Sequence, residues 1–308
     1  LADNVAVDSL ATLEILKTSA NEDTELADQF RRQMEIVSGI DHPNVAVITW
    51  IDVTPEDYPY AAIEHVPGMT LAQQLRQWRK EGAPPDVGTA LTLVRQLAGA
   101  MRLAHAAGVI HHDLRPENIV LREEDGTPVI VGLDIPLSPS TDREPTDPDA
   151  IKYLRYASPE QLRGESLTDQ SNDYSLGILL YELLAGKRPQ AAVSGWNAVL
   201  DRAERDEQVP LHEVREGLTK ETYQLVREAL GQQDVERMAS AAELLAGLDA
   251  AVEAEQSSDA PRVLAGSSLQ PKAAADPMWR RMWPAGAMLA GVLDIILTAF
   301  AIGRAPAN

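Results

Sequence analysis

Residues 111–120 read His-His-Asp-Leu-Arg-Pro-Glu-Asn-Ile-Val, and this stretch decides the fold. The chain on either side of it has two different patterns. Up to about residue 66, short β-rich runs surround one helical pattern, in which Phe30, Met34 and Val37 recur at helical spacing. Beyond residue 70, apolar stripes of helical period dominate, and residues 174–185 are apolar nearly all round, as expected of a buried helix. The sequence therefore predicts an α+β fold in which a small β-rich lobe precedes a larger helical lobe.

The stretch at 111–120 resembles the catalytic loop of protein kinases, whose pattern is H-R-D-L-K-P-E-N-I. In that family the Asp meets the hydroxyl of the protein substrate, and the Asn five positions later reaches a metal bound to the ATP phosphates. Asp113 and Asn118 have this separation, and Arg115 stands at the Lys position. The resemblance implies catalytic roles for Asp113, Arg115 and Asn118, with Asn118 also acting as a metal ligand.

Two earlier segments resemble landmarks of the small kinase lobe. The segment His42-Pro43-Asn44-Val45 is similar to the turn that follows the αC helix of the family. The segment Ile63-Glu64-His65-Val66 is similar to the gatekeeper and hinge. The hinge resemblance implies that a nucleotide contacts the chain at Glu64 and Val66.

Three later features resemble the large kinase lobe. Ser158-Pro159-Glu160 is similar to the A-P-E end of the activation segment, and Asp173 opens a run similar to the start of the buried αF helix. Arg237 stands where the family pairs an Arg with this glutamate, so structural roles are implied for Glu160, Asp173 and Arg237. The resemblance is to bacterial Ser/Thr kinases. It implies a bilobal protein-kinase-like fold over residues 1–252, with an N-lobe of about 1–66 and a C-lobe of about 67–252.

The residues that handle ATP depart from the family pattern. Counting back from His42 without gaps places Glu14 at the lysine position of the third kinase strand and Gln33 at the position of the αC glutamate. A carboxylate at this place would repel the phosphates of ATP, whereas the lysine of the family attracts them. Lys17 is the alternative lysine, but it lies three residues further on and points to the opposite face of a regular strand.

Two further departures concern the same site. The glycine-rich loop G-x-G-x-x-G is missing before this strand, which either a natural loss or a truncated sequence explains. The D-F-G site reads Asp134-Ile135-Pro136, so Asp134 keeps the metal-binding carboxylate while Pro136 fixes φ and removes one N–H. We therefore expect a pseudokinase with little or no phosphotransfer, and with no cofactor or only weak binding of ATP and Mg²⁺. The alternative is an active, divergent Ser/Thr protein kinase, because the base and both metal ligands survive.

The C-terminal part of the chain has a different composition. Residues 253–279 are rich in Ala, Ser, Pro and Asp, which predicts a flexible linker. Residues 280–304 predict a transmembrane helix, because 283–303 contain one charge, Asp294, and about 20 apolar residues span a bilayer. Arg280 and Arg281 precede this run, so the positive-inside rule places the kinase-like domain in the cytoplasm, attached to the cell membrane by a single pass.

The net charge and the predicted architecture limit the classes of partner that we expect. The formal net charge of −20 repels phosphates, which excludes nucleic acid as a partner. The architecture is similar to that of pseudokinases that mycobacteria fuse to MviN/MurJ-type lipid II flippases. That resemblance implies an upstream Ser/Thr kinase as the input and a forkhead-associated domain protein as the reader. Thr141 and Thr146 are the candidate phosphosites, because each has an acidic residue three positions later.

Overall fold

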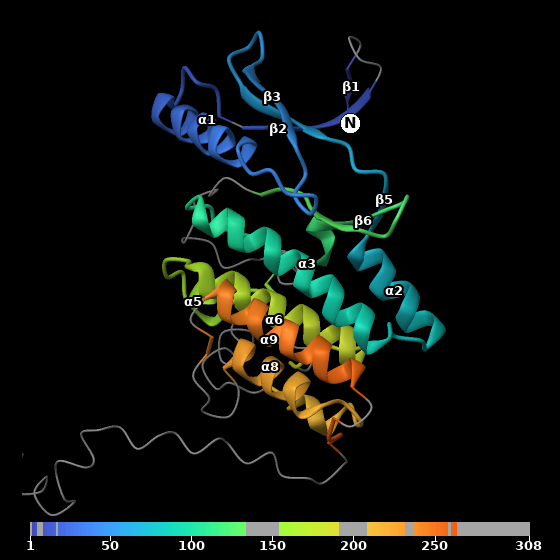
Figure 1. Ribbon diagram of the computed structural model, residues 1–308. Coiled ribbons are helices and arrows are strands. Elements are labelled where there is room, and N and C mark those ends of the chain that lie inside the picture. The colour runs from blue at the N-terminus through green and yellow to red at the C-terminus, as the bar shows by residue number, and fades with distance from the viewer. Residues whose placement is uncertain are drawn as a thin grey trace, which may run out of the picture. The chain divides into compact units, whose positions relative to one another are not determined.

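The computed structural model describes residues 2–4, 9–16, 18–133, 154–190, 208–231, 237–238, 240–257 and 260–263. All of them belong to the first of two units of the chain, Leu1–Gly266 (Figure 1). The predicted transmembrane segment and most of the predicted linker lie outside the described residues. None of the described helices combines the length and the apolar character that a membrane crossing needs.

The small lobe is built on an antiparallel sheet with the strand order β1-β2-β4-β3. The register places Glu14 of β2 opposite Ala61 of β4, and side chains alternate between the two faces of a strand. Leu16, two residues beyond Glu14, packs with Ala61 on the face that helix α1 covers. The β-rich character predicted for this part of the chain is confirmed. The strands are β1 Ala2–Asn4, β2 Ser9–Ile15, β3 Ile48–Val53 and β4 Pro59–Glu64.

Helix α1, Thr24–Ser38, packs on β3 and β4. Asp23 caps its start, because the Asp23 Oδ1 accepts a hydrogen bond of 2.9 Å from the N–H of Leu26. Phe30 and Met34 have no exposed surface and contact Leu16 and Ala61, which confirms the helical spacing seen in the sequence. The helix therefore fixes the inner face of the sheet, on which Glu14 lies.

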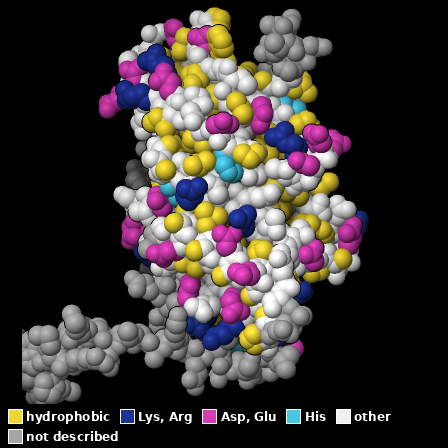
Figure 2. All heavy atoms as spheres, viewed as in Figure 1, with side chains coloured by type: hydrophobic (Ala, Val, Ile, Leu, Met, Phe, Trp, Pro, Cys, Tyr) yellow, Lys and Arg dark blue, Asp and Glu magenta, His cyan; other side chains and the backbone are white. Residues whose placement is uncertain are grey.

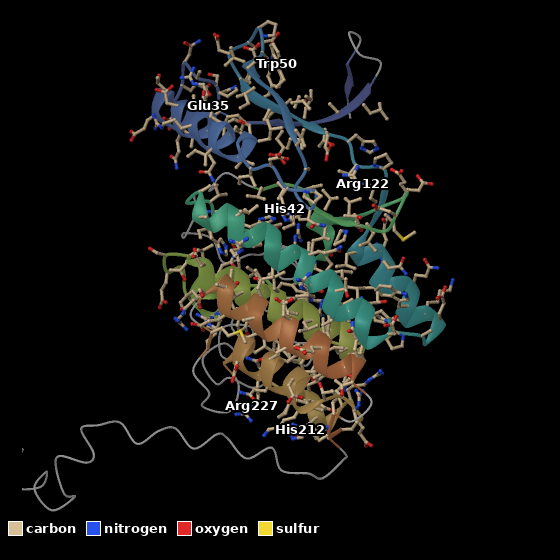
Figure 3. The ribbon with its side chains drawn as sticks, in the orientation of Figure 1. Glu35, His42, Trp50, Arg122, His212 and Arg227 are labelled. Carbon is tan, nitrogen blue, oxygen red and sulfur yellow. The ribbon has the colours of Figure 1, made fainter. Side chains whose placement is uncertain are left out.

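A turn at residues 42–45 connects the small lobe to a second sheet (Figure 3 labels His42). The backbone N–H of Asn44 donates to His42 Nδ1 at 3.2 Å, and its side-chain amide donates to the carbonyl of Pro128 at 2.6 Å. The backbone N–H of Ile130 donates to the carbonyl of Asn44 at 2.8 Å. This turn therefore holds the two sheets together next to the catalytic loop.

The second sheet has the order β5-β6-β7, with β5 Gly68–Thr70, β6 Ile119–Arg122 and β7 Pro128–Ile130. Gly68 allows the close approach of β5 to β6, because an added Cβ would lie 2.0 Å from the carbonyl oxygen of Leu121. The sheet follows directly on the residues predicted as the hinge.

The large lobe is helical, as predicted. Helix α6 is buried along nearly its whole length, and α3 packs against both α6 and α9 (Figure 1). The stripe of Leu91, Val94, Leu97 and Met101 on α3 has no exposed surface, and burying each such side chain stabilises the fold by about 1.5–3 kcal/mol. The helices are α2 Leu71–Glu81, α3 Val87–Ala106, α5 Pro159–Leu162, α6 Asp169–Ala185, α8 Lys220–Leu230 and α9 Ala241–Gln256, with short 3-10 helices at Pro116–Asn118 and Leu211–Glu213.

Helix α9 continues to Gln256, past residue 253, where the linker was predicted to begin. The reason is Glu255, whose Oε1 accepts hydrogen bonds from the hydroxyls of Thr219 at 3.0 Å and Thr222 at 2.8 Å. Glu255 also forms an ion pair with Arg262, and Arg262 forms a β-bridge with Thr219. The last described residues are therefore bound to the large lobe.

Candidate functional site

The catalytic-loop residues come together as the sequence predicts. The side-chain amide of Asn118 donates to the Asp113 carbonyl at 2.8 Å and to the Asp113 carboxylate at 3.0 Å. The Arg115 Nε lies 2.7 Å from the same carboxylate oxygen, Asp113 Oδ2. Burial raises the pKa of Asp113, and Arg115 and Asn118 oppose this effect. A held carboxylate with a raised pKa is suited to accept a proton from a hydroxyl.

A buried amide behind the loop holds it in place. Asn172 of α6 accepts a hydrogen bond of 3.0 Å from the N–H of His111 and donates one of 2.7 Å to the His111 carbonyl. Burial lowers the pKa of His111 to about 3, so its ring is neutral at pH 7, and its Nδ1 accepts a hydrogen bond from the Asp113 N–H. Asn172 was missed in the sequence, where Asp173 was taken as the structural residue.

Asp173 does not make this contact, although it lies in the predicted helix. It is completely buried, and neither of its carboxylate oxygens has a hydrogen-bond partner in the described part of the chain. Burial raises its pKa to about 7, Asp169 adds to this effect and Arg237 opposes it. Successive residues of a helix point about 100° apart, so only Asn172 faces the loop.

The predicted pair of Glu160 and Arg237 is confirmed. Two nitrogens of Arg237 donate to the two carboxylate oxygens of Glu160, at 3.0 and 3.2 Å. The hydroxyl of Ser171 donates to Glu160 Oε1 at 2.7 Å. Such a bidentate pair is geometrically specific, so it ties the start of α5 to the chain near α9.

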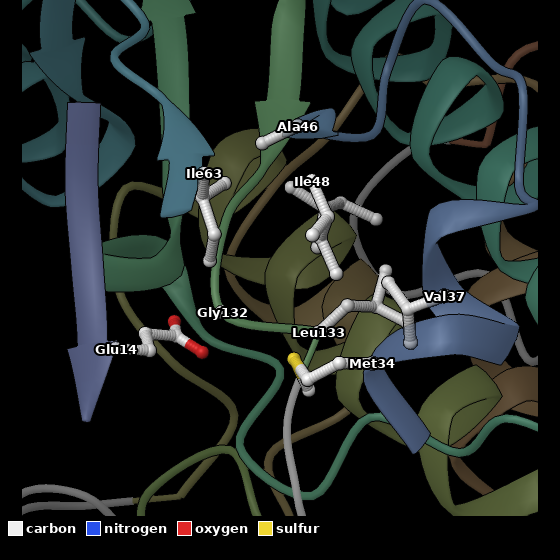
Figure 4. Close-up of a pocket in the computed structure, with 9 residues that line it drawn as sticks. Glu14, Met34, Val37, Ala46, Ile48, Ile63, Gly132 and Leu133 are labelled. Atoms are coloured by element: carbon white, nitrogen blue, oxygen red, sulfur yellow. The ribbon is translucent and has the colours of Figure 1, made fainter. Parts of the chain in front are cut away.

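Glu14 faces a small pocket at the junction of the lobes (Figure 4). Apolar side chains dominate the rest of the lining, among them Met34 and Val37 of α1 and Ile63 of β4. Gly132 and Leu133, which precede the predicted D-F-G site, also line it. Burial raises the pKa of Glu14. In the described part of the chain, no Lys or Arg forms an ion pair with this carboxylate, so the place predicted for a phosphate-binding lysine holds an acid.

Of the residues predicted for the hinge, Glu64 ends β4 and Val66 lies between β4 and β5. The Glu64 carboxylate lies 3.7 Å from Arg122 of β6, which Figure 3 labels. Val66 is buried in a cluster with Ala46, Ile63 and Val129. Gln33 lies on α1 beside Met34 and is partly buried. The structure thus places all three residues around the junction of the lobes. The side chain of Glu64 lies near Arg122, and that of Val66 packs in the apolar cluster.

Several predicted residues lie outside the described part of the chain. These are the alternative lysine, the D-F-G residues and the candidate phosphosites: Lys17, Asp134, Pro136, Thr141 and Thr146. Among the described residues, no cluster of three or more His, Asp or Glu side chains is arranged to hold a metal ion. The metal-ligating pair of Asn118 and Asp134 therefore stays a prediction.

A β-rich lobe and a helical lobe, with a catalytic-loop carboxylate and amide held at their junction, define a protein kinase fold. The chain belongs to the protein kinase domain family, whose pattern matches residues 4–247. Serine/threonine-protein kinase pkn3 of Myxococcus xanthus is 29% identical over 291 residues, which are 90% of this chain and 52% of that protein. PrkC of Bacillus subtilis is 32% identical over 198 residues, 63% of this chain and 30% of that protein. PknB of Mycobacterium leprae is 28% identical over 268 residues, 86% of this chain and 42% of that protein.

These relatives carry the name serine/threonine-protein kinase, and the chain spans about half of their length or less. On the face drawn in Figure 2, acidic and basic side chains are interspersed. The excess of acid that the sequence carries is therefore not gathered in one patch on that face.

Proposed function

We propose that this chain is a bacterial Ser/Thr-kinase-type module that transfers phosphate weakly or not at all and acts through phosphorylation-regulated protein interactions. The observation that carries the proposal is Glu14, which faces the pocket between the lobes where the family needs a cation. The described residues at this place do not fit the phosphates of ATP, because a carboxylate repels them. Asp113 and Asn118 are hydrogen-bonded to each other, so the catalytic loop keeps its shape. What this site lacks in the proposal is the cation that would bind the phosphates of ATP.

A phosphotransfer assay on the full 308-residue chain tests the proposal. With radiolabelled ATP, Mg²⁺ and a generic protein substrate, we expect no transfer above that of an Asp113→Asn control. In the same preparation, ATP and Mg²⁺ at millimolar concentration are expected to leave the melting temperature unchanged, because a ligand stabilises only the state that it binds. Transfer that Asp113→Asn abolishes would reject the first candidate in favour of the second.

The second candidate is an active, divergent Ser/Thr protein kinase, and the comparisons favour it over the first. The relatives are named Ser/Thr protein kinases and span most of this chain. The partly buried carboxyl of Asp113, with its raised pKa, is suited to take a proton from a hydroxyl. ATP would supply the phosphoryl group, and Mg²⁺ would neutralise its charge. Asn118 is the described residue that would bind the metal.

The proposal also includes attachment to the cell membrane through residues 280–304, with the kinase-type domain in the cytoplasm. An upstream Ser/Thr kinase would modify Thr141 or Thr146, and a forkhead-associated domain protein would read the phosphothreonine through charge-assisted contacts. In cells that express the full chain with an active kinase of the family, we expect the chain in the membrane fraction, phosphorylated at one of these threonines by mass spectrometry. A soluble chain or an unmodified segment would contradict this part of the proposal.

A further inference from the structure

The sheet of the small lobe has an outer face, opposite the inner face that α1 covers and that carries Glu14 and Ala61. Side chains alternate along a strand, so the residues next to these two in the chain point outward. The register brings the outward side chains of β2, β4 and β3 together in two adjoining rows. The outer face consists of Leu13, Ile15, Trp50, Tyr60 and Ala62, with Asp52 at its border on the edge strand β3.

A β-bulge places Trp50 on this outer face. The pairing of β3 with β4 shifts between Ile48 and Trp50, and both Ile48 and Ile51 pack on the inner face. In a regular strand, residues 48 and 50 would share a face, so the extra residue turns Trp50 outward. Trp50 lies at the end of the small lobe that is remote from the large lobe (Figure 3).

The outer face is apolar and uncovered. Trp50 is 61% exposed, and Leu13 and Ile15 are exposed as well. The indole N–H of Trp50 donates to the Asp52 carboxylate at 3.2 Å, which holds the exposed ring in a defined position. Contiguous exposed apolar side chains mark interaction sites, and Trp is among the residues that contribute most to binding at interfaces. We therefore expect another element to cover this face.

The charges on this sheet are acidic, and they select the partner. Asp52 accepts hydrogen bonds from the N–H groups of Val53 and Trp50, which lower its pKa, so it is ionised at pH 7. The turn between β3 and β4 adds the exposed Glu56 and Asp57. Strands β1 to β4 and this turn contain no Lys or Arg. A partner that covers the apolar side chains therefore gains from cations at its border.

We propose that the outer face binds a basic amphipathic helix of a partner protein. A helix is about 10 Å wide with its side chains and neighbouring strands lie about 4.8 Å apart, so one helix covers the three strands. Its apolar stripe packs on Leu13, Ile15 and Trp50, and Lys or Arg beside the stripe pairs with Asp52.

The same charges disfavour two other occupants. A second copy of the chain would bring the acidic borders of two outer faces together, and like charges repel. An anionic lipid surface would be repelled in the same way. The outer face is opposite Glu14, so this inference does not depend on the proposed function.

A pair of peptides of opposite charge tests the proposal. One is a helical peptide of Leu and Lys, about 14 residues long, with Leu at amphipathic spacing, and the other has Glu in place of every Lys. Fluorescence anisotropy of the labelled peptides, titrated with the full chain, measures both affinities. We expect saturable binding of the Lys peptide and binding of the Glu peptide that is at least roughly tenfold weaker. Equal affinities, or no saturable binding of the Lys peptide, would overturn the proposal.

Matched variants locate the binding site, because a chain with a net charge of −20 attracts any cationic peptide. Ile15→Ser and Ile36→Ser make the same change without altering charge, at residues that are 51% exposed on the outer face and 48% exposed on α1. Ile15→Ser should weaken the Lys peptide roughly tenfold, and Ile36→Ser should leave its affinity unchanged. Trp50→Ala should weaken it at least as much as Ile15→Ser, and it decides if Ile15→Ser does not fold. Undiminished binding to folded Trp50→Ala would place the site elsewhere and reject the proposal.

Two measurements on the chain alone identify the other occupants. In sedimentation velocity, a dimer that Trp50→Ala dissociates would show that a second copy covers the outer face. With vesicles of phosphatidylcholine and phosphatidylglycerol, association that Trp50→Ala reduces would show that lipid covers it. Either result would overturn the proposal, and we expect Trp50→Ala to change neither measurement.

Discussion

Replacing Glu14 by Lys is expected to strengthen the binding of ATP and Mg²⁺ at least roughly a hundredfold. Two unit charges about 4 Å apart interact by about 4 kcal/mol at an effective dielectric constant near 20. Reversing the sign at residue 14 changes this energy by up to about 8 kcal/mol, and a third of that is already about a hundredfold in Kd. Glu14 faces the pocket from β2, so the new ammonium would occupy the place of the carboxylate without a change in the sheet. Isothermal titration calorimetry on the full chain measures the affinity.

Three controls make this result specific to charge at the nucleotide site. Adenosine lacks phosphates, so its affinity should stay unchanged in Glu14→Lys. Glu14→Gln removes the charge alone and should give an intermediate ATP affinity. Because burial raises the pKa of Glu14, the difference between wild type and Glu14→Gln should grow as pH rises. Glu35→Lys makes the same change at an exposed position of α1 and should leave ATP binding unchanged. ATP binding by the wild type as tight as by Glu14→Lys would contradict the repulsion argument.

The parts of this fold that depend on local spacing were predictable from the sequence. The five-residue separation of Asp113 and Asn118 is read directly, and a short loop brings such residues together whatever surrounds them. The assignment of Glu14 to the lysine position followed from the family resemblance, by counting back from His42 without gaps. The partnership of Glu160 and Arg237, which are far apart in the chain, followed only from the family resemblance and is confirmed.

The features that could not be predicted depend on how the helices are rotated and packed against one another. The spacing of residues in the sequence does not determine that packing. Asn172 and Asp173 differ by a rotation of about 100° around the axis of α6, and the sequence did not single out Asn172 as the residue that contacts the catalytic loop. The extension of α9 depends on Glu255 reaching Thr219 and Thr222 from another helix. A cavity lined by Trp78 of α2 and Leu183 of α6 forms between two helices that are far apart in the chain, and no sequence motif indicates it. These features depend on contacts between segments that are far apart in the chain. Such contacts leave no periodic pattern in the sequence.

Asp173→Asn is expected to stabilise the folded protein by about 4 kcal/mol at pH 8 and by much less at pH 5. The carboxyl of Asp173 is buried without a hydrogen-bond partner in the described part of the chain, and its pKa is raised to about 7. In the unfolded chain its pKa is near 4, so between these values the folded state holds a proton that the unfolded state has lost. Unfolding then releases a proton, and rising pH favours it. The penalty is absent below about pH 4 and complete above about pH 7, and each unit between is worth about 1.4 kcal/mol.

Chemical denaturation of wild type and Asp173→Asn at a series of pH values from 5 to 8.5 measures this difference directly. Taking the difference removes the titration of all other groups, because both proteins share them. The advantage of Asn should rise with pH and become level above the raised pKa of Asp173. Asp249→Asn is the matched control, since Asp249 on α9 is 56% exposed and its ion pair with Arg95 is worth at most about 1 kcal/mol. Its effect should not grow with pH in this range. A pH-independent difference for Asp173→Asn would mean that the buried carboxyl is ionised throughout and has a cationic or hydrogen-bonding partner in the folded chain.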